Sequence, residues 1–405
     1  MNGRIEVWRE GRHVGQFVVA ADGVSFDYDE GASATPISLS LPRDRPAKKK
    51  AAFNFLANLL PEQERTRARM ASVYGAASAG VFDLIHAAGG DVAGGLVLLP
   101  EDQEPTKRAS EISPAADQDI AKRVEAIKRD DSDTTPAGVP ARFLLAGAQG
   151  KFALSLVEDD WYWPNESVPS THIVKPGSPT YRGIEAAEAA AMNLAKRAGL
   201  SVAAAGVETF ADQSAYVVRR FDREPSVGPL AARVHMEDLA QSLGRSPEGK
   251  YDVTAREVVS LLRTIDTGGG VTSEFLHQLA FNVIVGNADA HAKNYSLYLR
   301  PDGVAMTPLY DLVPVFLFPE VDQRLSMAIG GARSAKAVTP NHWRKFAQSV
   351  GLDVDEVLSL VREVAGAIGE ACSGDNIWAA LDPDQQRVAT QYVARSVERS
   401  LQPIR

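Results

Sequence analysis

The segment that decides the fold is Gly286-Asn287-Ala288-Asp289-Ala290-His291-Ala292-Lys293-Asn294, read together with the residues that follow it as far as Asp311. It comes directly after an apolar run with helical spacing that ends near Val285, so we expect a loop at the C-terminal end of a buried helix. Charged and amide side chains are dense in this loop. Taken alone, a solvated loop with an Asp turn would explain it equally well.

Beyond this loop the sequence predicts a β-hairpin. The stretch Tyr295–Leu299 alternates, Pro301-Asp302-Gly303 is a strong turn signal, and Val304–Met306 returns as a second strand. Because a hairpin brings its two ends together, we expect Asp289 and Asp311 to lie near each other in space.

Protein kinases use this arrangement of acidic and amide residues for phosphoryl transfer. One Asp orients the attacking hydroxyl, an Asn five residues later binds metal, and an Asp beyond a hairpin binds metal as well. Here Asp289 takes the first place, Asn294 the second and Asp311 the third. Oxygen ligands combined with ATP phosphates and water suit Mg²⁺, so the pattern predicts ATP and Mg²⁺ as cofactors.

Matching parts stand earlier in the chain, in the order that kinases use. The loop Gly147-Ala148-Gln149-Gly150-Lys151 lies between two strand-like segments, where backbone N–H groups could cover phosphates. It fits neither the Walker pattern nor the dinucleotide fingerprint. Lys175 ends a strand and could pair with phosphates, and Glu188 on the next helix could hold that lysine. Singly, each reads more simply as a surface residue, but the whole series in this order favours a kinase.

Composition and charge narrow the class of protein. The chain has 405 residues, of which 45% are apolar, so we expect two to three domains. A net charge of −9 argues against binding nucleic acid by bulk charge alone. The single cysteine, Cys372, excludes a disulfide scaffold and a multi-cysteine metal site. Because no bilayer-length apolar run or signal pattern is present, we expect a soluble cytoplasmic protein with no membrane partner.

The predicted fold class is α+β, with a β-rich small lobe and a helical large lobe in the manner of protein kinases, plus an extra N-terminal α+β module. We place the module at residues 1–100, where a short antiparallel meander precedes a helix and a buried strand. Residues 101–140 read as a polar, solvated connector with one helical patch. Residues 141–225 form the small lobe and residues 226–405 the large lobe.

These motifs resemble the HipA family of toxin Ser/Thr kinases, and the resemblance spans nearly the whole chain. It rests on the following stretches: Ser38–Pro42, Asn58–Glu62, Gly147–Lys151, His172–Pro176, Val218–Arg223, His235-x-Glu237-Asp238-x-x-Gln241 and Gly286–Asn294. The resemblance implies that Asp289 is the catalytic base, that Asn294 and Asp311 bind Mg²⁺ and that Lys175 contacts ATP phosphates.

The remaining assignments concern the nucleotide. The resemblance implies that a hinge meets adenine through its backbone, and the hinge residues are Val218, Arg219, Arg220 and Phe221. We also assign His291 and Lys293 to the nucleotide site, and Glu188 to supporting the lysine. His235 and Gln241 are interpreted as structural.

The resemblance also implies partners. Such kinases are held inactive by a small helix-turn-helix antitoxin (HipB-like), and the pair represses its own operon, so contact with operator DNA is expected only through that complex. The best-known members phosphorylate an aminoacyl-tRNA synthetase and halt translation. Two departures stand out: Leu144 replaces a Ser whose autophosphorylation inactivates relatives, and Arg219 replaces a common acidic residue.

Two other functions remain open. One is a pseudokinase that bridges antitoxin dimers on operator DNA, although every ligand residue is intact. The other is a metallohydrolase using Asp289, His291 and Asp311, although the chain's seven histidines include no pair at metal-ligand spacing. For direct DNA contact the candidate is the basic cluster Arg43, Arg45, Lys48, Lys49 and Lys50, which a solvated loop explains more simply.

Overall fold

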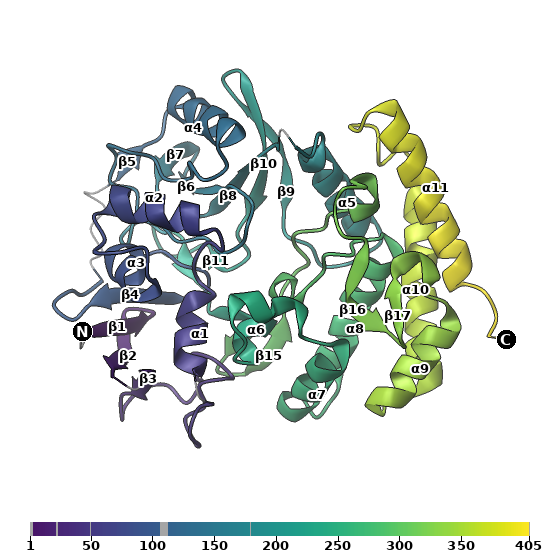
Figure 1. Ribbon diagram of the computed structural model, residues 1–405, viewed down its shortest axis with the longest axis horizontal. Helices are drawn as coiled ribbons and strands as arrows, with labels where there is room; N and C mark the ends of the chain where they lie inside the picture. The colour runs from purple at the N-terminus through teal and green to yellow at the C-terminus, as the bar shows by residue number, and fades with distance from the viewer. Residues whose placement is uncertain (1–2, 22, 49, 106–111, 179, 405) are drawn as a thin grey trace. The chain divides into compact units, whose positions relative to one another are not determined.

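The computed structural model describes residues 3–21, 23–48, 50–105, 112–178 and 180–404 (Figure 1). The chain divides into two compact units. Unit 1 comprises Met1–Pro179, Ala204–Glu248 and Tyr298–Gly303. Unit 2 comprises Thr180–Ala203, Gly249–Leu297 and Val304–Arg405.

Unit 1 begins with an antiparallel sheet, which confirms the predicted meander. Its strands, in the spatial order β3-β2-β1-β4, are β1 (Gly3–Arg9), β2 (Arg12–Ala20), β3 (Gly23–Tyr28) and β4 (Leu96–Pro100). Ile5, Val7 and Phe17 alternate inward and are fully buried. The helices that share this core are α1 (Ala51–Ala57), α2 (Glu64–Tyr74) and α3 (Val81–Ala88).

A six-stranded sheet forms the second part of unit 1, in the order β5-β7-β6-β8-β10-β9. The strands are β5 (Ser113–Pro114), β6 (Phe152–Val157), β7 (Asp160–Trp163), β8 (His172–Pro176), β9 (Ala205–Phe210) and β10 (Gln213–Arg219). Short elements follow: β11 (Arg223–Glu224), β12 (Ala232–Arg233), β13 (Met236–Asp238) and α6 (Leu239–Ser242). The strand-like segment expected after the Gly147–Lys151 loop is confirmed as β6, and the strand expected to end at Lys175 is confirmed as β8.

The expectation of a solvated connector is wrong for much of residues 101–140. The helix α4 (Asp117–Arg129) buries Ile120, Val124 and Ile127 in the same core as β6, β8 and β10 (Figure 1). These apolar residues recur at three- and four-residue spacing, which gives the helix an apolar stripe despite its polar composition. Residues 106–111 of this stretch lie outside the described residues.

The segment before the glycine-containing loop belongs to no strand, contrary to the strand-like segment expected there. Its side chains nevertheless alternate. Phe143 and Leu145 pack in the core of the six-stranded sheet, whereas Leu144 packs in the core of the N-terminal sheet and its helices. The backbone N–H of Leu144 donates to the carbonyl of Asp91 at 2.9 Å. Leu144 therefore ties the two parts of unit 1 together.

Unit 2 is mainly helical. Its helices are α5 (Ile184–Arg197), α7 (Ala255–Ile265), α8 (Gly270–Ile284), α9 (Pro340–Val350), α10 (Val354–Cys372) and α11 (Pro383–Ser400). The short hairpin of β16 (Arg324–Ile329) and β17 (Ala332–Ser334) accompanies them, with the 3₁₀ turns η4 (Val315–Leu317) and η5 (Ala335–Ala337). Gly199, with φ of +80°, follows α5 as predicted for a C-terminal glycine.

The expected lobe boundaries differ from these units in one respect. The predicted small lobe ran from residue 141 to residue 225, whereas α5 belongs to unit 2 and the chain up to Glu248 belongs to unit 1. The predicted hairpin is present as β14 (Ser296–Arg300) and β15 (Gly303–Met306), and the division between the units runs through it. Among the described residues, no helix is long and apolar enough to cross a membrane.

Candidate active site

The loop after α8 is held by its own main chain. The N–H of Asn287 donates to the carbonyl of Asn282 at 2.9 Å, and the N–H of His291 donates to the carbonyl of Asp289 at 2.7 Å. Strand β16 adds two bonds, because the N–H and the hydroxyl of Ser326 both reach the carbonyl of Ala288, at 2.9 and 3.0 Å. The backbone that carries Asp289 is therefore fixed from two sides.

The predicted metal ligands lie together. The side-chain amide of Asn294, in the 3₁₀ turn η3 (Ala292–Asn294), donates to Oδ2 of Asp311 at 2.6 Å. The Oδ1 atom of Asn294 accepts the N–H of His291 at 3.1 Å, which fixes the orientation of the amide. Asp311 has φ of +57°, a left-handed conformation that Asp tolerates better than most residues. The amide of Asn287 also bonds the carbonyl of Asp311 at 3.3 Å.

Asp289 receives a hydrogen bond from a residue that the sequence did not single out. The Tyr251 hydroxyl donates to Oδ1 of Asp289 at 2.9 Å. Tyr251 ends the short 3₁₀ helix η2 (Pro247–Tyr251), and the ring of Tyr251 meets the ring of His291 edge-on at 5.0 Å. No local pattern marks Tyr251 as functional, because its link to Asp289 exists only in the folded chain.

His291 is neutral in this loop. Burial and the Lys250 ammonium lower the pKa of His291 to about 3. The Nδ1 atom of His291 is buried and has no hydrogen-bond partner among the described residues. A buried polar atom without a partner is costly, so it fits a site that a ligand completes. Lys293, in the same turn, is also buried, and its carbonyl accepts the Tyr310 hydroxyl at 2.7 Å.

The glycine-containing loop of unit 1 is hydrogen-bonded to two consecutive residues, Glu62 and Gln63. The carbonyl of Gly147 accepts the N–H of Glu62 at 3.1 Å, and the carbonyl of Ala148 accepts the side-chain amide of Gln63 at 2.7 Å. Gly147 has φ of +104°, and Lys151 reaches back to the carbonyl of Ala146 at 2.9 Å.

Gly150, near the end of this loop, is closely surrounded, whereas the middle of the loop is open. A Cβ at Gly150 would lie 2.5 Å from the carbonyl oxygen of Asp131, so only glycine fits there. Ala148 is exposed and Gln149 is half-buried, so the middle of the loop faces solvent.

Lys175 and Glu188 are not surface residues. Lys175 stands on β8 opposite Tyr216 of β10, is 7% exposed, and places its ammonium 5.8 Å from the centre of the Tyr216 ring. Glu188 lies on α5 in unit 2 and is 2% exposed. Buried charges of this kind are rarely tolerated without a partner, so the simpler surface interpretation of both residues is wrong.

The backbone of the predicted hinge is partly occupied by hydrogen bonds within unit 1. The backbone N–H groups of Arg219 and Arg220 donate to the carbonyls of Ala204 and Thr171, both at 2.8 Å. Those two donors are thus already used within unit 1. Val218 is buried in β10, and the carbonyl of Phe221 accepts the Tyr298 hydroxyl at 3.0 Å.

The Arg220 side chain belongs to a buried ionic cluster. Arg220 and Arg223 contact Asp222 at 2.7 and 3.0 Å, and Arg223 contacts Asp91 at 3.0 Å. Burial opposes these charges, yet the two guanidiniums hold the pKa of Asp222 well below its usual range. This cluster links the hinge to the N-terminal part of unit 1, so the Arg220 guanidinium is a structural group.

The motif that begins at His235 also forms hydrogen bonds to the N-terminal part of unit 1. Nε2 of His235 contacts the carbonyl of Ile37 at 2.8 Å, while Nδ1 of His235 accepts the N–H of Gly95 at 3.3 Å. The N–H of Leu39 donates to Glu237 at 2.8 Å, and burial raises the pKa of Glu237 to about 7. These contacts support the structural interpretation of His235.

Gln241 acts in the same way. Its side-chain amide donates to the carbonyl of Phe55 in α1 at 3.2 Å, and its Oε1 accepts the N–H of Asp238 at 3.1 Å. The last residue of the motif therefore bonds the N-terminal part of unit 1 as well.

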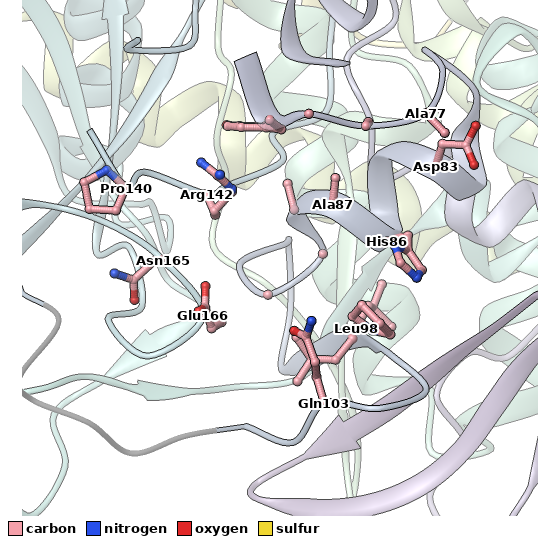
Figure 2. Close-up of a pocket in the computed structure, with 18 of the residues that line it drawn as sticks. Ala77, Asp83, His86, Ala87, Leu98, Gln103, Pro140, Arg142, Asn165 and Glu166 are labelled. Atoms are coloured by element: carbon pink, nitrogen blue, oxygen red, sulfur yellow. The ribbon is translucent and has the colours of Figure 1, made fainter. Parts of the chain in front are cut away.

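A cavity of about 910 Å³ lies elsewhere in unit 1 (Figure 2). Asn165 and Glu166 lie across it from His86 and Leu98. No residue of the predicted site lines this cavity, so the candidate active site is defined by side-chain geometry instead. Among the described residues, no group of three or more His, Cys, Asp or Glu side chains could hold a metal, so the metallohydrolase alternative finds no site there.

Arg43 of the predicted basic cluster makes contacts within the N-terminal part of unit 1. The Arg43 guanidinium stacks on the Tyr28 ring at 4.5 Å and donates to the carbonyls of Ser33 and Asp29. Lys49 lies outside the described residues.

Two family models match separate parts of this chain. The model of the HipA-like C-terminal domain matches residues 143–372, and the model of the HipA N-terminal domain matches residues 5–99. A Sinorhizobium fredii protein named "Putative kinase Y4mE" is 35% identical over 384 residues, which cover 91% of this chain and 90% of that protein.

Two further matches come from Shewanella oneidensis. The "Serine/threonine-protein kinase toxin HipA" is 28% identical, over 95% of this chain and 91% of that protein. A solved complex of HipA, HipB and its operator DNA contains a chain with a TM-score of 0.81 and 27% identity, covering 98% of this chain and 96% of that one. The predicted α+β kinase-like fold with an N-terminal module is confirmed. The chain therefore belongs to the HipA family.

Proposed function

We propose that this protein is an ATP- and Mg²⁺-dependent protein Ser/Thr kinase and the toxin of a toxin–antitoxin system. Membership of the HipA family and the kinase names of its relatives support this proposal. The observation that carries it is the 2.6 Å contact between Asn294 and Asp311, on a loop that also presents Asp289. Protein kinases need this trio of residues, and here all three are intact.

The residues present fit a nucleotide–metal complex. A carboxylate and an amide oxygen are ligands that Mg²⁺ accepts, so Asp311 and Asn294 would hold the metal. Nδ1 of His291, which has no partner within the described part of the chain, lies in the same loop and suits a polar group of the nucleotide. When bound, Mg²⁺·ATP would supply the γ-phosphoryl group and neutralise charge during transfer.

The residues of this chain orient the reacting groups and transfer a proton. Asp289 accepts the proton of a Ser or Thr hydroxyl as that oxygen attacks phosphorus, and the ADP oxygen leaves. In unit 1, we propose that the exposed middle of the Gly147–Lys151 loop covers phosphates and that Lys175 contacts them. In unit 1 the hinge backbone near Val218 to Phe221 meets adenine, and in unit 2 Lys293 binds the nucleotide.

The proposed partners follow from the family. We propose that a small helix-turn-helix antitoxin (HipB-like) binds this kinase and brings it to operator DNA, since the solved HipA chain is in a complex with HipB and operator DNA. The proposed substrate is a cytoplasmic protein that supports translation, with an aminoacyl-tRNA synthetase as the first candidate. The proposed site of action is accordingly the cytoplasm.

One experiment tests the kinase and its substrate together. Phosphoproteomes are compared after brief expression of the wild-type protein and of Asp289→Gln, and ADP release is measured for both purified proteins. We expect new Ser/Thr phosphorylation and ADP release with the wild type alone. A wild-type protein that binds its antitoxin and DNA but releases no ADP would instead favour the alternative, a kinase-like corepressor.

A further inference from the structure

The side chain of Asp289 needs a fixed orientation, which its backbone alone does not supply. A general base works only when its carboxylate oxygen points at the hydroxyl whose proton it takes, within hydrogen-bond reach. The main chain around Asp289 is fixed by the Ser326 and His291 bonds. The carboxylate itself turns about two side-chain bonds, so hydrogen bonds to its own oxygens are needed to select one orientation.

Tyr251 makes such a contact. Its hydroxyl donates to Oδ1 of Asp289 at 2.9 Å, a hydrogen bond to a charged acceptor. The two residues come from different elements of unit 2, since Tyr251 lies before α7 and Asp289 lies after α8. The contact therefore depends on the fold of the unit and not on local sequence.

The Tyr251 ring is itself held in place, although half of its surface is exposed. The His291 ring meets it edge-on at 5.0 Å with an angle of 79° between the planes. The ammonium of Lys250, a buried residue, lies 5.0 Å from the centre of the Tyr251 ring. Edge-to-face and cation–π contacts each favour one ring position. These two contacts hold the ring in one position, and therefore fix the direction of its hydroxyl group.

The same residues connect the base to the metal ligands. His291 contacts the Tyr251 ring through its side chain and the Oδ1 of Asn294 through its N–H, and Asn294 contacts Asp311. We propose that Tyr251 is a positioning residue for phosphoryl transfer, holding the Asp289 carboxylate in register with the Asn294–Asp311 pair. This inference rests on the proposed kinase function and adds a residue to its site.

The kinetic test uses Tyr251→Phe, which keeps the ring contacts and removes only the hydroxyl. We expect kcat to fall roughly tenfold or more, the usual effect of losing a hydrogen bond to a charged group. KM for ATP should change by less than about twofold, because the hydroxyl acts on the base and not on nucleotide binding. Tyr162→Phe, on β7 of unit 1, is the matched control and should leave both constants unchanged. An unchanged kcat in Tyr251→Phe would overturn the proposal, because the hydroxyl would then have no effect on Asp289. A raised kcat would also overturn it, because the Tyr251 hydroxyl would then be competing with the substrate hydroxyl for the Asp289 carboxylate.

A second measurement tests the contact without relying on turnover. The unfolding equilibria of Tyr251→Phe, Asp289→Ala and the double variant form a double-mutant cycle, because alanine offers no oxygen to accept the Tyr251 hydroxyl. We expect the double variant to be less destabilised than the sum of the single variants. Strict additivity would overturn the inference even in an active kinase. A wild-type protein that transfers no phosphate while the cycle still shows coupling would refute the proposed function, and with it any positioning role in transfer.

Discussion

Replacing Leu144 by Ala tests how the two parts of unit 1 are joined. Leu144 is fully buried and packs in the core of the N-terminal sheet, while its neighbours Phe143 and Leu145 pack in the other core. Truncation of a buried leucine removes its transfer free energy and leaves a cavity, so Leu144→Ala should cost about 3 kcal/mol of stability. That cost lowers the ratio of folded to unfolded protein roughly 100-fold.

Urea unfolding, followed by far-UV circular dichroism, measures this change. Leu401→Ala is the matched control, because Leu401 is 46% exposed and its truncation should change stability by less than about 0.5 kcal/mol. If Leu144→Ala costs less than about 1 kcal/mol, Leu144 does not join the two cores and the packing argument fails.

The same residue bears on self-inactivation. Leu144 has no hydroxyl to phosphorylate, and the Ser155 hydroxyl on β6 is buried and donates to the carbonyl of Pro169 at 2.9 Å. We therefore expect mass spectrometry after incubation with ATP and Mg²⁺ to find no phosphate between Arg142 and Ser155. A phosphate in that range, accompanied by loss of activity, would show that this segment retains self-inactivation through another acceptor.

Three further outcomes are expected. Asp311→Asn should retain the fold but lose about 100-fold or more in the rate of phosphoryl transfer, measured as ADP release, because the charge that faces the metal is removed; wild-type turnover would refute the metal assignment. Gly286→Ala should lower the melting temperature, because its Cβ would lie 2.7 Å from both Phe316 and the hydroxyl of Tyr392, whereas Gly269→Ala, with similar positive φ but nothing within 4 Å, should cost less. Burial lowers the pKa of His235 to about 4, so its contribution to stability is present above pH 6.5 and is lost as the pH falls toward 4, by about 3 kcal/mol. In His235→Gln, the free energy of unfolding, measured by urea titrations at several pH values, should fall less steeply between pH 6.5 and pH 4. The same pH dependence as in the wild type would contradict a buried neutral histidine.

The sequence by itself determined the features that depend on neighbouring residues. The loop Gly286–Asn294, the hairpin turn at Pro301-Asp302-Gly303 and the approach of this loop to Asp311 all follow from turn chemistry and the short hairpin between them. The glycine after α5 and the strands β6, β8 and β10 were likewise predictable, because helix endings and strand periodicity are local properties.

The tertiary structure alone decided which distant residues meet. Tyr251 reaches Asp289 across 38 residues, and Arg223 reaches Asp91 across 132, and no spacing rule marks either pair. Leu144 packs in the N-terminal core, although its neighbours pack in the other core. The helix α4 buries an apolar stripe within a polar stretch of sequence. In both cases the apolar surface supplied by distant parts of the chain decides which side chains are buried. Local sequence sets which elements form, but burial and long-range packing set which of their faces touch.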